Sequence, residues 1–135
     1  MLGSAGWLRI YAGEPEAAIP LLERAMRLSP LDPEMSHFLG GLAYAHLMLD
    51  RPEQALDNAR AAMHQKPRWP TSHRALITAL WRLGRDEEAR QAALRHQEET
   101  PDACRVFAER NVALFPGQPL ADMMIQALRN AGVPE

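Results

Sequence analysis

The chain has 135 residues, of which 47% are hydrophobic and 24% are charged, and its formal net charge is -2. These values are those of one globular domain and exclude a disordered chain. Fifteen basic residues against seventeen acidic ones leave no excess charge for nucleic acid or an anionic membrane. We therefore expect a single folded domain that binds neither.

The cysteine content and the hydropathy pattern indicate a cytoplasmic protein. A lone cysteine, Cys104, cannot form an internal disulfide, which favours a reducing compartment. The longest stretch without formal charge, Met35 to Leu49, has fifteen residues, whereas a membrane span needs about 20. No basic residue precedes Arg9, as a signal peptide would require.

The composition favours helices, and the chain repeats itself. It contains 22 alanines but only ten valines, isoleucines and threonines together. Small residues and helix breakers recur after 34 residues: Asp50, Pro52, Ala55, Ala59, Ala62 and Pro67 return as Gly84, Asp86, Ala89, Ala93, His96 and Pro101. Gly13, Ala18, Leu22, Ala25 and Pro30 precede the first of these sets by 37 residues. Such a period predicts helix pairs that stack on one another.

The repeat divides the chain into three helix pairs, over about residues 1–32, 33–69 and 70–101. The first pair is degenerate because Pro20 lies inside its second helix. In the second pair a helix over 33–49 is followed by Asp50 and Glu53, which form a candidate capping box. In the third pair Gly84 is the expected left-handed stop of the first helix.

The tail after Pro101 departs from the repeat. It predicts a short helix over 102–111 and an amphipathic helix over 120–130 that ends before Gly132. The expected inward face of the second helix is Leu120, Met123, Met124, Ala127 and Leu128, and the outward face is Asp122, Gln126, Arg129 and Asn130. We expect these helices to close the end of the stack.

The 34-residue helix-turn-helix pattern resembles the tetratricopeptide repeat over about residues 3 to 101. Ala55 or Ala89 stands at position 20 of the repeat, Ala62 at position 27 and a proline at position 32. The tryptophan at position 4 of the family is absent, and His96 replaces the small residue at position 27. The resemblance implies an all-α fold: a right-handed solenoid of three helix pairs with C-terminal capping helices, seven or eight helices in one domain over 1–135.

A narrower resemblance concerns two segments, 27–33 and 127–135. They are similar to the C-terminal tetratricopeptide regions of bacterial class III adenylate/guanylate cyclase-like proteins and related winged-helix regulators. In such proteins the region follows a catalytic or DNA-binding domain, and nothing of a cyclase catalytic domain is present here. The resemblance implies lineage and a regulatory context, with no activity of its own.

The sequence contains no recognisable catalytic or metal-binding constellation. The five histidines, His37, His46, His64, His73 and His96, include no pair one helical turn apart with a carboxylate. Gly40 and Gly41 lie inside a helical stretch and are expected to let two helices approach closely. Cys104 has no base at a suitable spacing, so we expect it to be buried. We expect no enzyme, no cofactor and no metal.

The remaining candidate is a binding surface for protein. In the resembled family the first helices line a concave groove, and aromatic and arginine side chains anchor peptides there. The candidate groove residues are Trp7, Tyr11, His37, Tyr44, Met48, Arg74, Thr78, Trp81 and Arg82. The alternative, that this aromatic stripe belongs to the core, stays open. The function expected is protein-protein interaction, with a regulatory or dimerisation arm of a larger signalling protein as the alternative.

Two further expectations concern the partner. The carboxylate clamp of chaperone-binding relatives needs Lys and Asn where this chain has Gly40, Tyr44 and Thr78, so a chaperone C-terminus is disfavoured and any anion would meet Arg74 and Arg82. The first helix has no lid before it, so we expect an exposed apolar flank that supports self-association or packs on an upstream domain. That flank consists of Leu2, Trp7, Leu8 and Ile10.

Overall fold

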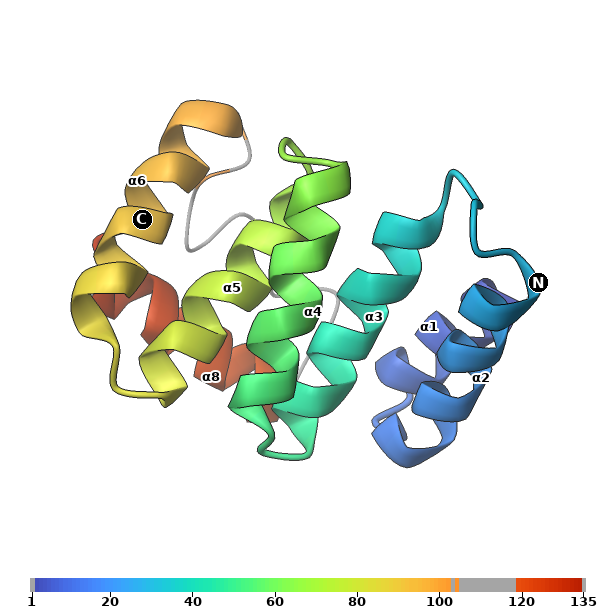
Figure 1. Cartoon of the computed structure of the whole chain (residues 1–135). Coiled ribbons are helices and arrows are strands. Elements are labelled where there is room, and N and C mark those ends of the chain that lie inside the picture. Colours follow the sequence, from blue (N-terminus) through green and yellow to red (C-terminus); the bar gives the residue numbers. More distant parts are fainter. Residues whose placement is uncertain (1, 103, 105–118, 135) are drawn as a thin grey trace.

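The computed structural model describes residues 2–102, 104 and 119–134, and over these residues the chain is entirely helical (Figure 1). The predicted helix over 102–111 falls largely outside the described residues. The seven helices of these described ranges are α1 (Leu2–Tyr11), α2 (Pro15–Leu28), α3 (Met35–Met48), α4 (Pro52–Gln65), α5 (Pro70–Arg82), α6 (Asp86–Glu99) and α8 (Pro119–Asn130).

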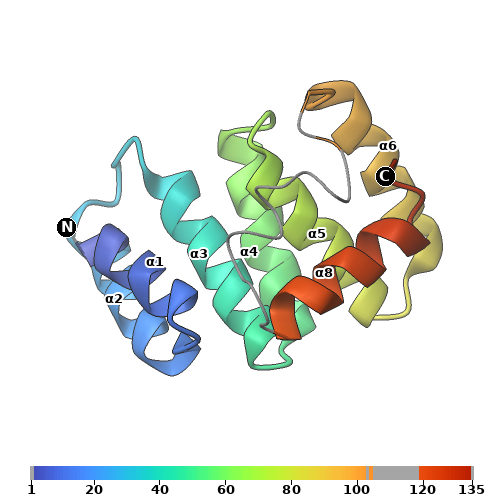
Figure 2. The same ribbon diagram turned by 180° about the vertical axis from the view of Figure 1, so that it is seen from behind.

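The first six helices form three pairs that stack in chain order. Each helix packs on the next one along the chain, and α1, α3 and α5 also contact each other in a row. The first helices therefore form one layer and the second helices the other, with the N-terminus beside α1 and the C-terminus beside α6 (Figures 1 and 2). The predicted all-α stack of helix pairs is confirmed.

The two helices of each pair are joined by the same left-handed turn. Gly13, Asp50 and Gly84 have φ angles of 77°, 56° and 74°. The amide of the next residue donates back to a carbonyl five residues earlier, as from Arg85 to Leu80 at 2.9 Å. The stop predicted at Gly84 is confirmed. Asp50 takes the same conformation because a short polar side chain tolerates it.

The capping box predicted at Asp50 and Glu53 is wrong. Helix α4 begins at Pro52 with Arg51 at its N-cap, and no side chain caps it. Asp50 belongs to the preceding turn, and its exposed carboxylate forms an ion pair with Arg82 of α5. The left-handed turn therefore occupies the residue that the sequence pattern assigned to the cap.

Small residues allow the helices to pack closely, as predicted. Buried alanines such as Ala55, Ala59 and Ala62 line the inward side of the second helices. In α3, a Cβ atom on Gly40 would lie 2.6 Å from the ring of Trp69. A Cβ atom on Gly41 would lie 2.9 Å from Cδ1 of Leu22 in α2. Only glycine leaves room for these neighbours.

Helix α8 lies across the layer of first helices, where it packs on α5 and touches α3 (Figure 2). Its predicted inward face is buried except for the half-buried Met123, and its predicted outward face is exposed. Instead of extending the stack beyond α6, the helix folds back onto α5. The exposed side of α6 carries ion pairs such as Arg90–Glu87, and Leu94 is the one large hydrophobic residue exposed on it, so this side offers α8 little apolar surface.

The expected apolar flank at the N-terminal end is mostly buried. Trp7 and Ile10 belong to the core, Leu2 is half-buried, and Leu8 alone of the four is exposed. The flank is buried because α1 packs on both α2 and α3. No helix in the described ranges is long and apolar enough to span a membrane.

Candidate functional site

An aromatic cluster joins the first two helix pairs on the layer of first helices. The ring of Trp7 lies 5.1 Å from that of His37, 5.3 Å from that of Tyr44 and 5.7 Å from that of Tyr11, centroid to centroid. The indole N–H of Trp7 donates to the carbonyl oxygen of His37 at 3.0 Å. These contacts tie α1 to α3 by edge and tilted ring packing.

Two members of this cluster are too deeply buried to anchor a partner. Trp7 is 5% exposed and Tyr44 is 2% exposed, so the alternative that the stripe belongs to the core is correct for both. Tyr11 is 40% exposed, and burial, with Tyr44 as a second cause, raises the pKa of its hydroxyl above the usual value. His37 is half-buried, and burial lowers the pKa of its imidazole. Tyr11 is therefore the most exposed of these four side chains, and His37 is partly accessible.

The sequence pattern missed one member of the aromatic cluster, Trp69. Its ring lies 6.4 Å from that of Trp7 and 5.6 Å from that of His37. It stands before Pro70 at the N-cap of α5 in extended backbone, and therefore outside any helical spacing. The tryptophan-proline pair at a helix start, opposite Gly40, is the signal that could have found it.

The predicted groove residues of α5 divide into buried and accessible ones. Thr78 is fully buried, and its hydroxyl donates to the carbonyl of Arg74 at 2.7 Å. Arg74 itself is 9% exposed. Both side chains are therefore inaccessible in this structure, as are all the residues of α5 from Ser72 to Leu80. Trp81 is half-buried and Arg82 is exposed, where it pairs with Asp50.

Two recesses flank α8 at its two ends. A recess of about 410 Å³ lies between Trp81 and the C-terminal part of α8. A second, of about 510 Å³, lies between the start of α8, the end of α3 and the turn after α1. It is lined by Ala12, Gly13, Pro15, Glu16, Met48, Leu49, Pro119, Leu120 and Met123.

We call the surface of the first-helix layer on which α8 lies the inner face. Its accessible side chains are Tyr11, Met48, Trp81 and Arg82, and the two recesses flank α8 on it. Helix α8 lies across this face.

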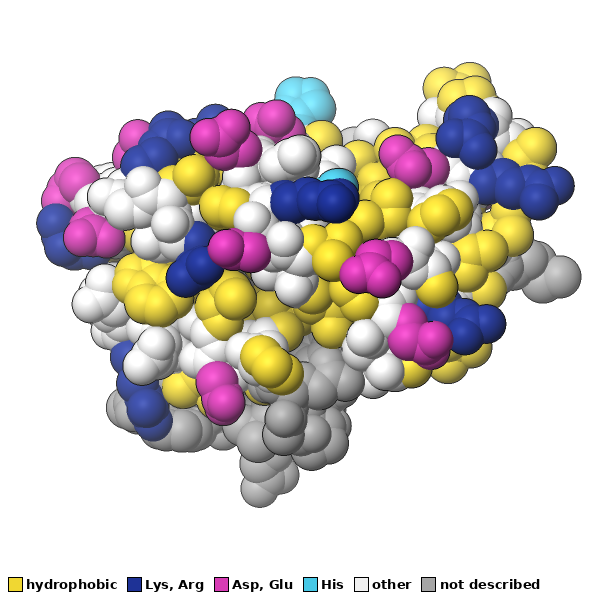
Figure 3. All heavy atoms as spheres, turned by 90° about the horizontal axis from the view of Figure 1, so that it is seen from below, with side chains coloured by type: hydrophobic (Ala, Val, Ile, Leu, Met, Phe, Trp, Pro, Cys, Tyr) yellow, Lys and Arg dark blue, Asp and Glu magenta, His cyan; other side chains and the backbone are white. Residues whose placement is uncertain are grey.

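The charged side chains of the surface are mixed in sign. Figure 3 shows acidic and basic side chains interspersed, with hydrophobic side chains between them. Among the described side chains of that face there is no extended patch of one sign, in agreement with the balanced composition.

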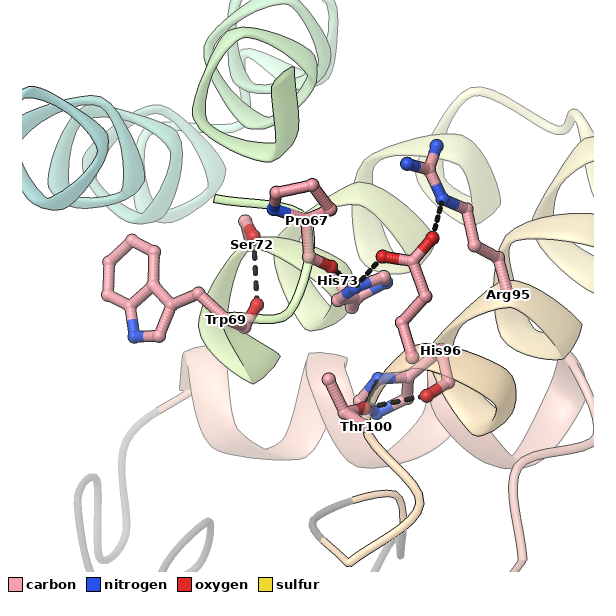
Figure 4. A network of polar contacts seen from close by, with 8 residues as sticks. Pro67, Trp69, Ser72, His73, Arg95, His96 and Thr100 are labelled. Carbon is pink, nitrogen blue, oxygen red and sulfur yellow. Dashed lines mark hydrogen bonds and ion pairs between the residues drawn. The ribbon is translucent and has the colours of Figure 1, made fainter. Parts of the chain in front are cut away.

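A buried histidine pair lies at the contact of α5 with α6 (Figure 4). The rings of His73 and His96 stack with centroids 5.1 Å apart and planes 26° apart. Nε2 of His73 donates to the carbonyl of Pro67 at 2.5 Å. Nδ1 of His96 lies 2.7 Å from the hydroxyl of Thr100, which itself donates to the His96 carbonyl at 2.6 Å.

Both histidines are held neutral. Burial is the largest cause for both, and it lowers the pKa of the His73 imidazole. For His96, burial together with the nearby His73 and Arg74 lowers the pKa to about 3. An imidazole that stays neutral throughout the physiological range is a poor proton shuttle. Among the described residues no three metal-ligating side chains converge. The role of the histidine pair is therefore structural: the two stacked rings pack α5 against α6.

Comparison with known proteins gives consistent results. A sequence profile of the tetratricopeptide repeat matches residues 4–73 and 41–103. The protein STIP1 homolog of Dictyostelium discoideum is 35% identical over 78 residues, which are 57% of this chain and 13% of that protein. This chain thus spans only a small part of its curated relative.

Two solved structures share the fold. The Sgt2 TPR domain from Aspergillus fumigatus superposes with a TM-score of 0.68 at 19% identity, over 95% of this chain and 74% of that one. The second TPR domain of human RPAP3, in complex with the HSP70 peptide SGPTIEEVD, superposes with a TM-score of 0.65 at 18% identity. That match covers 95% of this chain and 92% of the RPAP3 domain.

Proposed function

Because the chain belongs to the tetratricopeptide repeat family, we propose that it is a protein-protein interaction module that binds a segment of a partner protein on its inner face. One observation carries the proposal: an amphipathic helix of the chain itself, α8, packs on α5 and α3. A surface that takes one amphipathic helix has the shape and the apolar character to take another. Binding of this kind needs neither catalysis nor a cofactor.

The accessible side chains of the inner face suit this role. Tyr11 and Trp81 are partly exposed, and Arg82, the next residue of α5 after Trp81, exposes a guanidinium that pairs with Asp50. Aromatic and arginine side chains contribute much of the binding energy in protein interfaces because they bury large areas with few rotatable bonds. The mostly apolar recess next to Met48 offers room for apolar side chains of a partner, and the recess next to Trp81 presents the polar side chains Gln126, Arg129 and Asn130.

The partner is proposed to differ from the chaperone peptide bound by the RPAP3 domain. The three positions at which the family's clamp would require Lys and Asn hold Gly40, Tyr44 and Thr78. Gly40 packs against Trp69, and Tyr44 and Thr78 are buried. None of the three presents a cation or an amide to a terminal carboxylate.

Capture of partners from a native lysate, followed by mass spectrometry, tests the proposed function. Trp81→Ala and Tyr11→Ala together should lower the recovery of specific partners by more than ten-fold, since two central anchors contribute about 2 kcal/mol or more. Leu94→Ala is the matched control, because Leu94 is an exposed apolar side chain on α6, outside the inner face. Equal recovery with the double variant and the control would contradict the inner-face assignment.

The regulatory-arm alternative rests on the two short segments 27–33 and 127–135 alone. None of the proteins compared above is cyclase-like, so we keep it only as a second hypothesis. It differs from the first in one measurable respect, since an arm that only dimerises would bind a second copy of itself and no other protein. Self-association and a cytoplasmic location also stay predictions, and light scattering over a range of concentrations tests the first of these.

A further inference from the structure

Helix α8 combines two properties that set it apart from α1 to α6. It lies across the layer of first helices instead of continuing the stack, and it covers the part of the inner face formed by α5 and α3. Building on the proposed function, we propose that α8 is a displaceable internal occupant of the binding surface. The external partner is then an amphipathic helix with the same apolar spacing, which binds by replacing α8.

The apolar side of α8 defines the chemistry of that partner. Leu120, Met124 and Leu128, spaced four residues apart, are each buried, and Ala121 and Ala127 are buried beside them. The opposite side carries the exposed Asp122, Gln126, Arg129 and Asn130. A partner helix should therefore present large apolar residues at i, i+4 and i+8, with small residues next to them and a polar outer side.

The fit of α8 on the inner face is incomplete at its first turn. There the recess of about 510 Å³ reaches from Leu120 and Met123 to Met48. Apolar side chains that line such a recess lack contacts that a closer partner would supply. A helix with bulkier apolar residues at this end would thus fill the inner face better than α8 does. The recess of about 410 Å³ at the last turn is lined by Trp81 and by polar side chains of α8, so it is open to the polar outer side of the helix.

Displacement follows from competition for one surface. While α8 occupies the inner face, the apparent affinity for an external helix is reduced by the fraction of molecules in which α8 is released. Weakening the contact of α8 should therefore strengthen external binding, which a purely structural α8 would not do. An increase in the affinity for an external helix when the contact of α8 is weakened therefore distinguishes a displaceable α8 from a purely structural one.

The test uses the full chain and a labelled peptide of residues 119–134 as probe, with binding followed by fluorescence anisotropy. Met124→Asp places a carboxylate on the buried side of α8, and Leu94→Asp places one at an exposed position of α6, outside the inner face, as the matched control. We expect Met124→Asp to bind the peptide at least about ten-fold more tightly than the wild-type chain and the control do. A peptide that carries Met124→Asp should not bind.

Each outcome has a defined meaning, provided that circular dichroism shows folded Met124→Asp. If Met124→Asp and wild type bind the peptide equally, the inner face takes a helix but α8 does not compete, so this inference fails and the proposed function stands. If neither binds, this inference also fails, and the lysate experiment with Trp81 and Tyr11 decides the proposed function. Loss of peptide binding with Trp81→Ala, and its retention with Leu94→Ala, would place the site beside α5.

Hydrogen exchange of the wild-type chain is a second test, which applies even if Met124→Asp does not fold. Excess peptide should accelerate the exchange of the amides of α8 and leave those of α3 and α5 protected, because the external helix takes the place of α8. Unchanged protection of α8 at a peptide excess that saturates binding, or no binding at any excess, would overturn the proposal.

Discussion

His73 and His96 stack face to face, 5.1 Å apart, at the contact of α5 with α6, and both are buried in the neutral form. In the unfolded chain each imidazole takes up a proton below pH of about 6.5, whereas folded His96 stays neutral because its pKa is about 3. The contribution of the neutral histidine pair to the free energy of unfolding is therefore fully present above the unfolded pKa. It is lost as the pH falls toward the folded pKa of His96.

The first prediction concerns acid stability. His96→Ala should remove part of the pH dependence of the free energy of unfolding: between pH 7.5 and 5, wild type should lose roughly 2 kcal/mol more than the variant does. Urea unfolding at the two pH values measures this difference. His64→Ala, at an exposed position on α4, is the control and should keep the wild-type dependence. Equal losses in wild type and His96→Ala would show that the pair does not couple folding to protonation.

The second prediction concerns helix approach at Gly41. Alanine is normally the better helix former by about 1 kcal/mol, but here its Cβ would lie 2.9 Å from Cδ1 of Leu22 and 3.2 Å from Nε1 of Trp7. Since overpacking costs about 1–3 kcal/mol, Gly41→Ala should lower the free energy of unfolding by roughly 1–2 kcal/mol. Thermal melting measures it, with Gln54→Ala on the exposed side of α4 as control. A raised melting temperature for Gly41→Ala would contradict the close contact.

The third prediction concerns the left-handed turn at Asp50, whose φ is 56°. Asp50→Gly and Asp50→Ala both remove the exposed ion pair with Arg82, so their difference isolates the backbone conformation. Asp50→Gly should be more stable than Asp50→Ala by about 1 kcal/mol, because alanine is strained at positive φ. Chemical denaturation of the two variants measures the difference. Equal stability would mean that the turn relaxes to another conformation.

The fourth prediction concerns the chaperone peptide SGPTIEEVD, which binds the human RPAP3 domain. Isothermal titration calorimetry should detect no saturable binding to this chain, because Gly40, Tyr44 and Thr78 cannot clamp a carboxylate. The RPAP3 domain is the positive control. Saturable binding that disappears with Arg82→Ala would show that this arginine replaces the clamp.

The sequence predicts the helices well because their signals are local. The 34-residue period places the second pair's first helix at 33–49, and the structure has it at Met35–Met48. Gly84 ends its helix in the expected conformation, since a left-handed residue is a property of the backbone at that position. The inward and outward sides of α8 follow from its own periodicity in the same way.

The candidate site was predicted less well because exposure is not local. Helical spacing puts Tyr44 and Thr78 on the stripe with Trp81, but their burial depends on which elements pack there. Trp69 joins the aromatic cluster from the loop before α5, and His96 of α6 stacks on His73 of α5. The residue spacing within one helix does not encode contacts between different elements. The position of α8 likewise depends on where an apolar surface lies open in three dimensions.

The contact of α8 with α3 changes how this chain should unfold. In a linear repeat array each unit touches only its neighbours, so the terminal pair frays first and independently. Here the last described helix reaches back past α5 to the middle of the array. Fraying of the C-terminal end must therefore also break the contact of α8 with α3, so the unfolding of the last helix pair is coupled to the centre of the array.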